Sequence, residues 1–374
     1  MNNTSATLTV EVWDRATAIG GLPRELDDLS GRALEPNVFN ESLMFIAALR
    51  RMDVHIPLWI VCIRGPAGIL LGVVAMVVAP VRRSVPAMVL RNWVHRNCFL
   101  GTPILDAHFA RQVLEALAAW IESGAAPAGG IEWVKVSWDG PFGQLVRQVF
   151  SPSRSWKILI LSRQRAMLER AQDMKASISG KHAKELRRLE RRLASHGSIA
   201  YAVMQPADDW QAWFDEFLAV EASGWKGAEG SAIRSRPEDA AFFREVIQRA
   251  HASGQLQLLR MSVAGKAVAM KLNLRARGMS YSLKIGYDET YAQYSPGLLL
   301  ELFNIKAFEL EPDGILSMDS CAPADHPMIS RLWSARREIA TVTLIRRGVL
   351  LHIFAKLRPM AQRLKRTLFT KPIR

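Results

Sequence analysis

A run of three strands that leads into a helix, residues 256–311, constrains the fold of this 374-residue chain more than any other stretch. Apolar-rich segments separated by Gly-containing turns predict the strands, which are 256–263, 267–274 and 279–287. A helix is expected over 298–310. Ser295 suits its N-cap, Pro296 suits its first position, and Gly297 leaves the backbone open to close approach. Free N–H groups at such a helix start bind anions, so the sequence predicts a phosphate or pyrophosphate site there.

The rest of the chain repeats a similar order of elements twice. Patterns of apolar residues predict a helix, three strands, and then helices alternating with strands in the first half, and the second half follows much the same order. We therefore predict an α+β fold of two tandem units over 1–165 and 175–345, followed by a basic tail over 346–374. Each unit is expected to be a mixed, mostly antiparallel sheet flanked by helices. Three less regular segments are expected to form a strand with a loop (1–30), a basic crossover (163–179) and a helix (328–337).

The net charge of +14 is concentrated in two segments. Residues 154–192 hold twelve basic and four acidic side chains, and residues 346–374 hold nine basic and no acidic ones. Because these charges are not interleaved with exposed aromatic residues, general binding of nucleic acid is disfavoured. The tail predicts a basic amphipathic helix with three open roles. They are docking on the domain, peripheral contact with an anionic inner-membrane surface, and binding of an anionic ligand such as a cyclic dinucleotide.

Cysteine and histidine usage argues against a disulfide frame or a metal site. Cys62, Cys98 and Cys321 share no short spacing, and the eight histidines are scattered. The most apolar stretch, 69–79, is shorter than the roughly 20 residues that a membrane span needs. The first residues also lack the pattern of a signal peptide. We therefore expect a cytoplasmic protein without a metal ion.

Four segments of the second half together resemble one family. They are Glu221–Ser231 with its Gly-Trp-Lys-Gly run, Tyr281–Tyr291, Tyr294–Gly297, and Asp319–Trp333 with Asp-Ser-Cys, His-Pro-Met and Arg-Leu-Trp. On these residues the chain resembles the FemAB-like, CelD-like branch of the GNAT acyltransferase superfamily over about 175–345. Residues 1–165 resemble a degenerate first GNAT half in their order of elements. The resemblance therefore implies two tandem GNAT-like halves.

The same resemblance implies an N-acyltransferase that uses acetyl-CoA or another acyl-CoA. Its acceptor would be an amino sugar or another amine of a cell-envelope polysaccharide or its precursor, as in exopolysaccharide synthesis. Two alternatives stay open. One is a Fem-type transferase that uses aminoacyl-tRNA, and the other is a non-catalytic nucleotide-binding component of a polysaccharide-synthesis complex.

The resemblance assigns catalytic roles to residues at the ends of strands. Asp319 is the candidate base or amine-orienting carboxylate, with loop capping as its alternative. Tyr291 and Tyr294 are candidates for protonating the leaving thiolate, or else they form the wall of the pocket. A backbone N–H on the central strand would stabilise the oxyanion.

Binding roles follow in the same way. The donor is expected at Ser295, Gly297 and Leu298. This loop departs from the usual Arg/Gln-x-x-Gly-x-Gly/Ala pattern, and Pro296 has no N–H, so a phosphorylated donor other than CoA is the alternative. Substrate contacts are expected from Glu221, Trp225, Lys226, Lys284 and Asp288. For Lys284 the alternative is a surface ion pair, and for Trp225 it is packing as a lid on the sheet.

Overall fold

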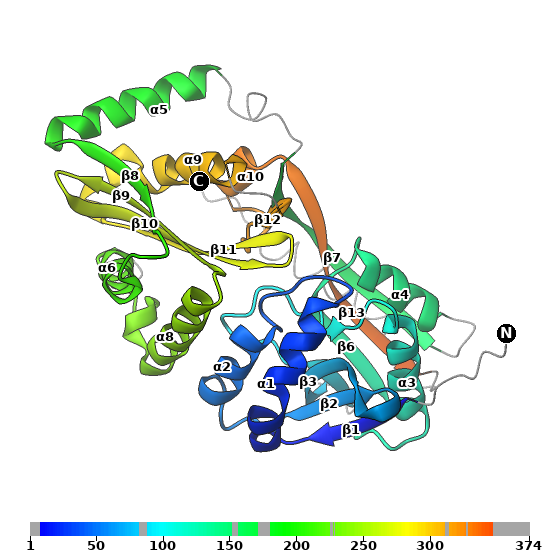
Figure 1. The fold of residues 1–374 in the computed structure, drawn as a ribbon. Coiled ribbons are helices and arrows are strands. Elements are labelled where there is room, and N and C mark those ends of the chain that lie inside the picture. Colours follow the sequence, from blue (N-terminus) through cyan, green and yellow to red (C-terminus); the bar gives the residue numbers. More distant parts are fainter. Residues whose placement is uncertain are drawn as a thin grey trace.

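The computed structural model describes residues 8–81, 88–151, 156–170, 180–224, 227, 229–310, 314–326 and 328–346. These residues form two lobes, and one mixed sheet of 13 strands runs through both of them (Figure 1). The predicted α+β class is confirmed. Trp225, Lys226 and the tail beyond Arg346 lie outside the described residues.

The first lobe, drawn in blue and cyan in Figure 1, is a sheet with helices on both faces. Its strands are β1 (Thr9–Trp13), β2 (Trp59–Arg64), β3 (Leu70–Pro80), β4 (Met88–Asn92), β5 (Ile104–Leu105) and β6 (Gly130–Ser137). Its helices are α1 (Arg15–Gly31), α2 (Ser42–Arg51), α3 (Ala110–Glu122) and α4 (Pro141–Val149). Helices α1 and α2 share one apolar core with the sheet, and α3 and α4 share the core on the opposite face.

The second lobe, drawn in green, yellow and orange, has the same layered construction (Figure 1). Its strands are β8 (Ile199–Val203), β9 (Leu256–Val263), β10 (Lys266–Ala276), β11 (Met279–Tyr287) and β12 (Ser317–Asp319). Its α-helices are α5 (Gly180–Leu193), α6 (Trp210–Ala222), α8 (Pro237–Ala252), α9 (Pro296–Glu309) and α10 (Ile329–Leu332). Short 3₁₀ turns include η4 (Ala194–His196), η5 (Ile233–Ser235) and η6 (Glu289–Tyr294). Helices α6 and α8 pack in the same core as α1 and α2, so the apolar interior is continuous between the lobes.

The two lobes repeat one strand order. In the first lobe β1, β2, β3 and β4 pair antiparallel, and β6 then pairs parallel with β4. In the second lobe β8, β9, β10 and β11 pair antiparallel, and β12 then pairs parallel with β11. The tandem arrangement of two similar halves is therefore confirmed.

Two long strands join the lobes, namely β7 (Trp156–Glu169) and β13 (Ala335–Arg346). They pair antiparallel along their whole shared length, from Ala335 opposite Met167 to Arg346 opposite Trp156. Strand β13, the last strand that the structure describes, also pairs with β6 of the first lobe, and β7 pairs with β12 of the second. Each lobe thus ends on a strand from the other half of the sequence.

Three local predictions were wrong. Residues 15–31 form α1 instead of a loop, because Asp14 caps the helix at Thr17 N and buried apolar residues recur every three or four positions. Residues 163–169 continue β7, and residues 335–337 begin β13, because these two segments pair with each other. The helix expected over 328–337 is therefore limited to the single turn α10. Among the described residues, no helix combines the length and apolarity needed to cross a membrane.

Candidate functional site

Strands β11 and β12 separate at the centre of the second lobe. They pair only from Met279 to Tyr281 on β11 and from Ser317 to Asp319 on β12. Beyond that point no described strand pairs with this side of β11, so its edge over 282–287 carries backbone groups outside the ladder. A bulge at Leu283 interrupts the pairing with β10 on the other side. Bulges are common next to active sites, where they redirect backbone and side chains.

The corresponding place in the first lobe is filled by the protein itself. Strands β4 and β6 pair only at Leu90 and Arg91, and then they separate. The Asn92 amide donates to the carbonyls of Gly101 (2.9 Å) and Val134 (3.1 Å) and accepts from Val134 N (2.7 Å). A Cβ on Gly101 would lie 2.2 Å from the Val134 oxygen, which shows how closely the chain is packed there. Among the described residues, the strand edge without a neighbouring strand is therefore a feature of the second lobe.

Asp319 lies at the point where β12 leaves β11. Its carboxylate is fully buried and receives hydrogen bonds from Arg337 at 2.9 Å and from Cys321 N at 2.8 Å, with Arg165 at 3.4 Å. Burial alone would raise its pKa, but the nearby Arg165 and Arg337 guanidinium groups and the Cys321 N–H outweigh burial and hold the pKa below its ordinary value. The carboxylate is thus ionised and committed to two cations. A base role for Asp319 stays a prediction, and its hydrogen bond from Cys321 N–H fits the loop-capping alternative.

The predicted donor loop leads into α9 as expected, with Pro296 in the first position. Ser295 has a left-handed backbone (φ 53°), and its side chain makes no capping hydrogen bond. Its carbonyl accepts the N–H groups of Leu298 (3.0 Å) and Leu299 (3.1 Å). Since Pro296 has no N–H, Gly297 N–H is the remaining donor at the predicted anion site. The donor roles of Ser295, Gly297 and Leu298 stay predictions.

The tyrosines of this loop face the end of α5. The Tyr294 hydroxyl and His196 Nε2 are hydrogen-bonded at 2.8 Å, and the Arg192 guanidinium lies 5.5 Å from the centre of the Tyr294 ring. The Tyr291 ring meets the His196 ring edge-on at 5.9 Å. Tyr294 is buried, and the roles proposed for Tyr291 and Tyr294 stay predictions.

The predicted acceptor residues gather around the far end of β11. A Cβ on Gly286 would lie 2.7 Å from Glu221 Cα, so the end of α6 lies directly against this strand. The buried Glu221 carboxylate accepts Ile233 N–H at 2.9 Å. Lys284 Nζ lies 5.6 Å from the centre of the Phe243 ring of α8. The structure therefore brings Glu221 and Lys284 to the same strand end.

Asp288 follows directly and caps η6, because its carboxylate accepts both the N–H (3.0 Å) and the hydroxyl (2.7 Å) of Thr290. Partial burial would raise its pKa, but the Thr290 hydrogen bonds and the Lys266 ammonium 3.6 Å away lower the pKa below its ordinary value. This capping gives Asp288 a structural role, and its contact with substrate stays a prediction.

A buried polar network under α9 escaped the sequence analysis. Lys271 of β10 donates to Glu301 of α9 at 2.7 Å and to Ser282 of β11 at 2.6 Å. Glu301 also accepts from Trp333 Nε1 at 3.2 Å and from Asn304 at 3.0 Å. The available signal was Lys271 itself, a charge in the middle of an apolar strand, since such a charge needs a partner when it is buried. This network fixes α9 on the sheet below the donor loop.

The described residues contain no cluster of His, Cys, Asp or Glu side chains that could hold a metal ion.

Comparisons with known proteins give one family and one fold. Residues 180–309 match the acetyltransferase (GNAT) domain. A conserved protein of unknown function from Bacteroides thetaiotaomicron aligns with a TM-score of 0.55 at 12% identity, over 90% of this chain and 100% of its own. FemX aligns with a TM-score of 0.54 at 11% identity, over 89% of this chain and 98% of its own. The C-terminal domain of a putative lysylphosphatidylglycerol synthetase from Agrobacterium fabrum aligns with a TM-score of 0.52 at 12% identity, over 91% of this chain and 96% of its own. No curated protein matches the chain in sequence.

Proposed function

From the premise that this chain carries a GNAT acetyltransferase domain over residues 180–309 on the fold of FemX, we propose that it is an N-acyltransferase. The proposed donor is acetyl-CoA or another acyl-CoA, and the proposed acceptor is an amino sugar or another amine of a cell-envelope polysaccharide or its precursor. The observation that carries this proposal is the separation of β12 from β11, whose pairing stops after Tyr281 and Asp319. Backbone N–H groups at the edge of a rigid strand suit an oxyanion that forms during acyl transfer.

In the proposed reaction a neutral acceptor amine attacks the thioester carbonyl carbon. A C–N bond forms, the C–S bond breaks, and the thiolate leaves with the proton that the amine gives up. The β11 edge stabilises the oxyanion, and Glu221 and Lys284 at the same strand end orient the acceptor. The lowered pKa of Asp319 makes its carboxylate a weak proton acceptor at neutral pH, so we do not assign it the role of the base. Its proposed role is to hold Arg165 and Arg337 where the strands separate.

Calorimetric titration with acetyl-CoA, followed by a thiol-release assay with glucosamine, tests this proposal. Binding at or below millimolar acetyl-CoA and amine-dependent release of free thiol are expected. Release of thiol without an amine measures hydrolysis and serves as the internal control. Absence of both binding and release would contradict an acyl-CoA donor.

A Fem-type aminoacyl transferase is the second candidate. Two observations favour it, namely the FemX-like fold and the start of α9. There Pro296 lacks an N–H and the N–H groups of Leu298 and Leu299 bond to Ser295, so few donors remain for the pyrophosphate of CoA. Charged aminoacyl-tRNA is then the donor to test beside acetyl-CoA. Transfer from aminoacyl-tRNA with no binding of acetyl-CoA would replace the first candidate by this one.

The localisation proposed with this function is cytoplasmic, with residues 346–374 making peripheral contact with the inner membrane. The nine basic residues of this segment support the proposal, since each contributes roughly 1 kcal/mol near an anionic surface. Flotation with anionic vesicles, comparing the full chain with one that ends at Arg346, tests it. Equal flotation of the two would contradict it, and added cyclic dinucleotide tests the alternative ligand.

A further inference from the structure

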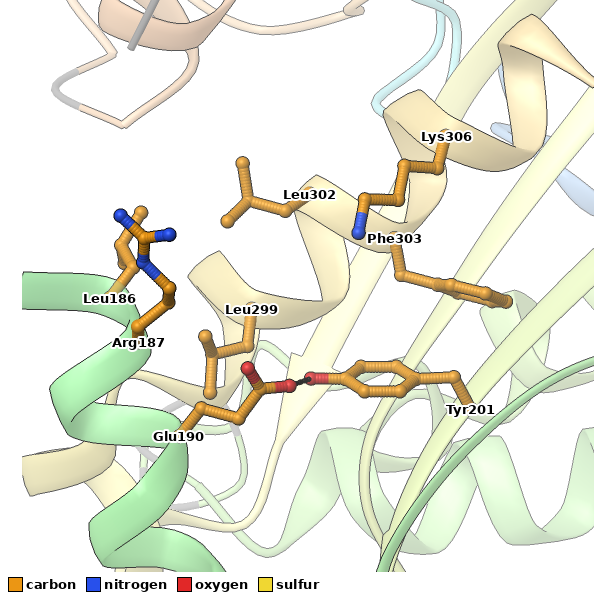
Figure 2. Close-up of a pocket in the computed structure, with 8 residues that line it drawn as sticks. All are labelled: Leu186, Arg187, Glu190, Tyr201, Leu299, Leu302, Phe303 and Lys306. Carbon is orange, nitrogen blue, oxygen red and sulfur yellow. Dashed lines mark hydrogen bonds between the residues drawn. The ribbon is translucent and has the colours of Figure 1, made fainter. Parts of the chain in front are cut away.

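A pocket of about 270 Å³ lies between α5, β8 and α9 (Figure 2). Its apolar wall consists of Leu186 from α5 and of Leu299, Leu302 and Phe303 from α9. Tyr201 of β8 adds an aromatic side, with its ring tilted by 31° against the Phe303 ring at a centroid distance of 5.1 Å. The two rings contact each other and do not face each other across the pocket. This lining suits an aliphatic occupant better than a flat ring.

The pocket carries a net positive charge. Figure 2 shows Arg187 of α5 and Lys306 of α9 on opposite sides of Leu302, and both side chains are exposed. Neither forms an ion pair with a residue that the structure describes. The one acid in the lining, Glu190, accepts a hydrogen bond from the Tyr201 hydroxyl at 2.8 Å. Two cations against one acid favour an anionic occupant.

Neighbouring cations of α5 differ from Arg187 because they have partners. Arg188 donates to Glu185 at 2.8 Å, and Arg192 lies over the Tyr294 ring. Arg187 therefore stands apart as the cation of α5 that lines the pocket without a partner. This contrast supplies a matched control within one helix.

Helix α9 separates this pocket from the strand edge at β11. Glu301 and Asn304 on one side of the helix are buried and bond to Lys271 and Asn273 of the sheet. Lys306, with Leu302 and Phe303, lies on the other side and lines the pocket. A ligand in the pocket would therefore not occupy the site proposed for acyl transfer.

We propose that this pocket binds a free single-chain amphiphile with one anionic head group, such as a fatty acid or an alkyl phosphate. The chain lies against the leucine wall, and the head group lies between Arg187 and Lys306. The volume of about 270 Å³ lies just below the range of small-molecule sites, which span roughly 300–1,000 Å³. Such a volume suits one short chain and excludes the two chains of a membrane phospholipid.

Calorimetric titration of the full chain with decyl phosphate, below its micelle-forming concentration, tests this inference. Decyltrimethylammonium keeps the chain and reverses the charge, and butyl phosphate keeps the charge and shortens the chain. Both are expected to bind about tenfold more weakly or worse, because each loses one of the two contributions. Acyl-transfer activity is measured separately and need not change, so failure of this inference and failure of the proposed function are distinguishable.

The variant Arg187→Ala/Lys306→Ala is expected to bind decyl phosphate about tenfold more weakly, since a charge-assisted contact contributes at least that much. Arg188→Ala is the matched control and should bind as the wild type does. Circular dichroism and thermal unfolding establish that all three proteins are folded. Equal affinity in the double variant, or equal binding of the cationic chain, would overturn the inference. Binding to phosphatidylglycerol vesicles that requires Arg187 and Lys306, without binding of free decyl phosphate, would also overturn it, because the occupant would then be a membrane surface.

Discussion

At the scale of single residues, Asp319 has the most constrained charge of the candidate site. Replacing it in Asp319→Asn leaves Arg165 and Arg337 without their shared carboxylate. Breaking a buried ion pair costs about 3–5 kcal/mol, so the free energy of unfolding should fall by about that much in urea titrations. Asp288→Asn is the matched control, because its carboxylate caps η6, a role that Asn can also fill, and pairs only with the exposed Lys266 ammonium. It should cost less than about 1 kcal/mol. Equal, small losses in both variants would contradict the positioning role of Asp319.

Glu41, at the start of α2, gives a residue-scale prediction of pH dependence. Burial raises its pKa from the ordinary 4.5 to about 7, although the Gln255 amide lies 3.5 Å away. Between these values the folded protein holds a proton that the unfolded chain has released, so stability decreases as the pH rises from about 4.5 through 7. The difference between these two pKa values corresponds to a loss of roughly 3 kcal/mol in the free energy of unfolding. Urea titrations at several pH values should show this decrease.

The Glu41→Gln variant is the control for that measurement, since it cannot release a proton. Its stability should lack the part of the pH dependence that Glu41 causes. His95 acts in the opposite direction in both proteins, because burial lowers its pKa to about 3 and stability therefore rises with pH up to its ordinary 6.5. The difference between wild type and variant cancels that contribution. If the free energies of unfolding of the wild type and of Glu41→Gln differed by the same amount at every pH, Glu41 would be ionised inside the protein.

The sequence pointed to the right strand ends but not to the partners found there. Lys284 lies in β11, Asp288 directly follows it, and Asp319 ends β12. The alternation of these strands is local, so the three positions could be predicted. Arg165 could not be linked to Asp319, because the two residues lie 154 positions apart and meet only through strand pairing. The ion pairs of Asp319 with Arg165 and Arg337 therefore result from the fold and leave no local pattern in the sequence.

At the scale of elements, prediction succeeded where the deciding contacts are close in sequence. Strands β9 to β11 and helix α9 match their predicted ranges within about two residues, because turns and alternation define them. Prediction failed for β7 and β13, whose charged segments become strands only because they pair with each other. The bulge at Leu283, which shapes the proposed site, also depends on the register with β10 and could not be predicted from the sequence.

The contact between α6 and β11 gives a prediction at this scale. In Gly286→Ala the added Cβ would lie 2.7 Å from Glu221 Cα, so α6 or β11 must shift. Overpacking of this kind costs typically 1–3 kcal/mol. Thermal unfolding should show that loss, and any acyl-transfer activity should fall with it because the acceptor residues move. Gly129→Ala is the control, since a Cβ there would meet nothing within 4 Å and stability should stay the same. Full stability and activity in Gly286→Ala would separate α6 from the site.

At the scale of the whole molecule, the exchange of β7 and β13 makes the two lobes depend on each other. The first lobe needs β13 beside β6, and the second lobe needs β7 beside β12. The lobes also share one apolar core through α2 and α8. Ion pairs cross the same boundary, with Arg96 on Asp239 at 2.8 Å and Arg50 on Glu245 at 2.6 Å. We therefore expect the lobes to unfold together, even though they repeat one architecture.

Val342→Ala tests this dependence, because Val342 is a fully buried residue of β13 in the core of the first lobe. Deleting its methyl groups should destabilise the protein by about 2 kcal/mol. Native-state hydrogen exchange, read on β2 in the first lobe and β10 in the second, should show the same loss in both strands, since global opening exposes them together. Val12→Ala on exposed β1 is the control and should change neither strand by more than about 0.5 kcal/mol. A loss confined to β2 would mean that the lobes open separately. Strands β7 and β13 would then join the lobes without making their folding cooperative.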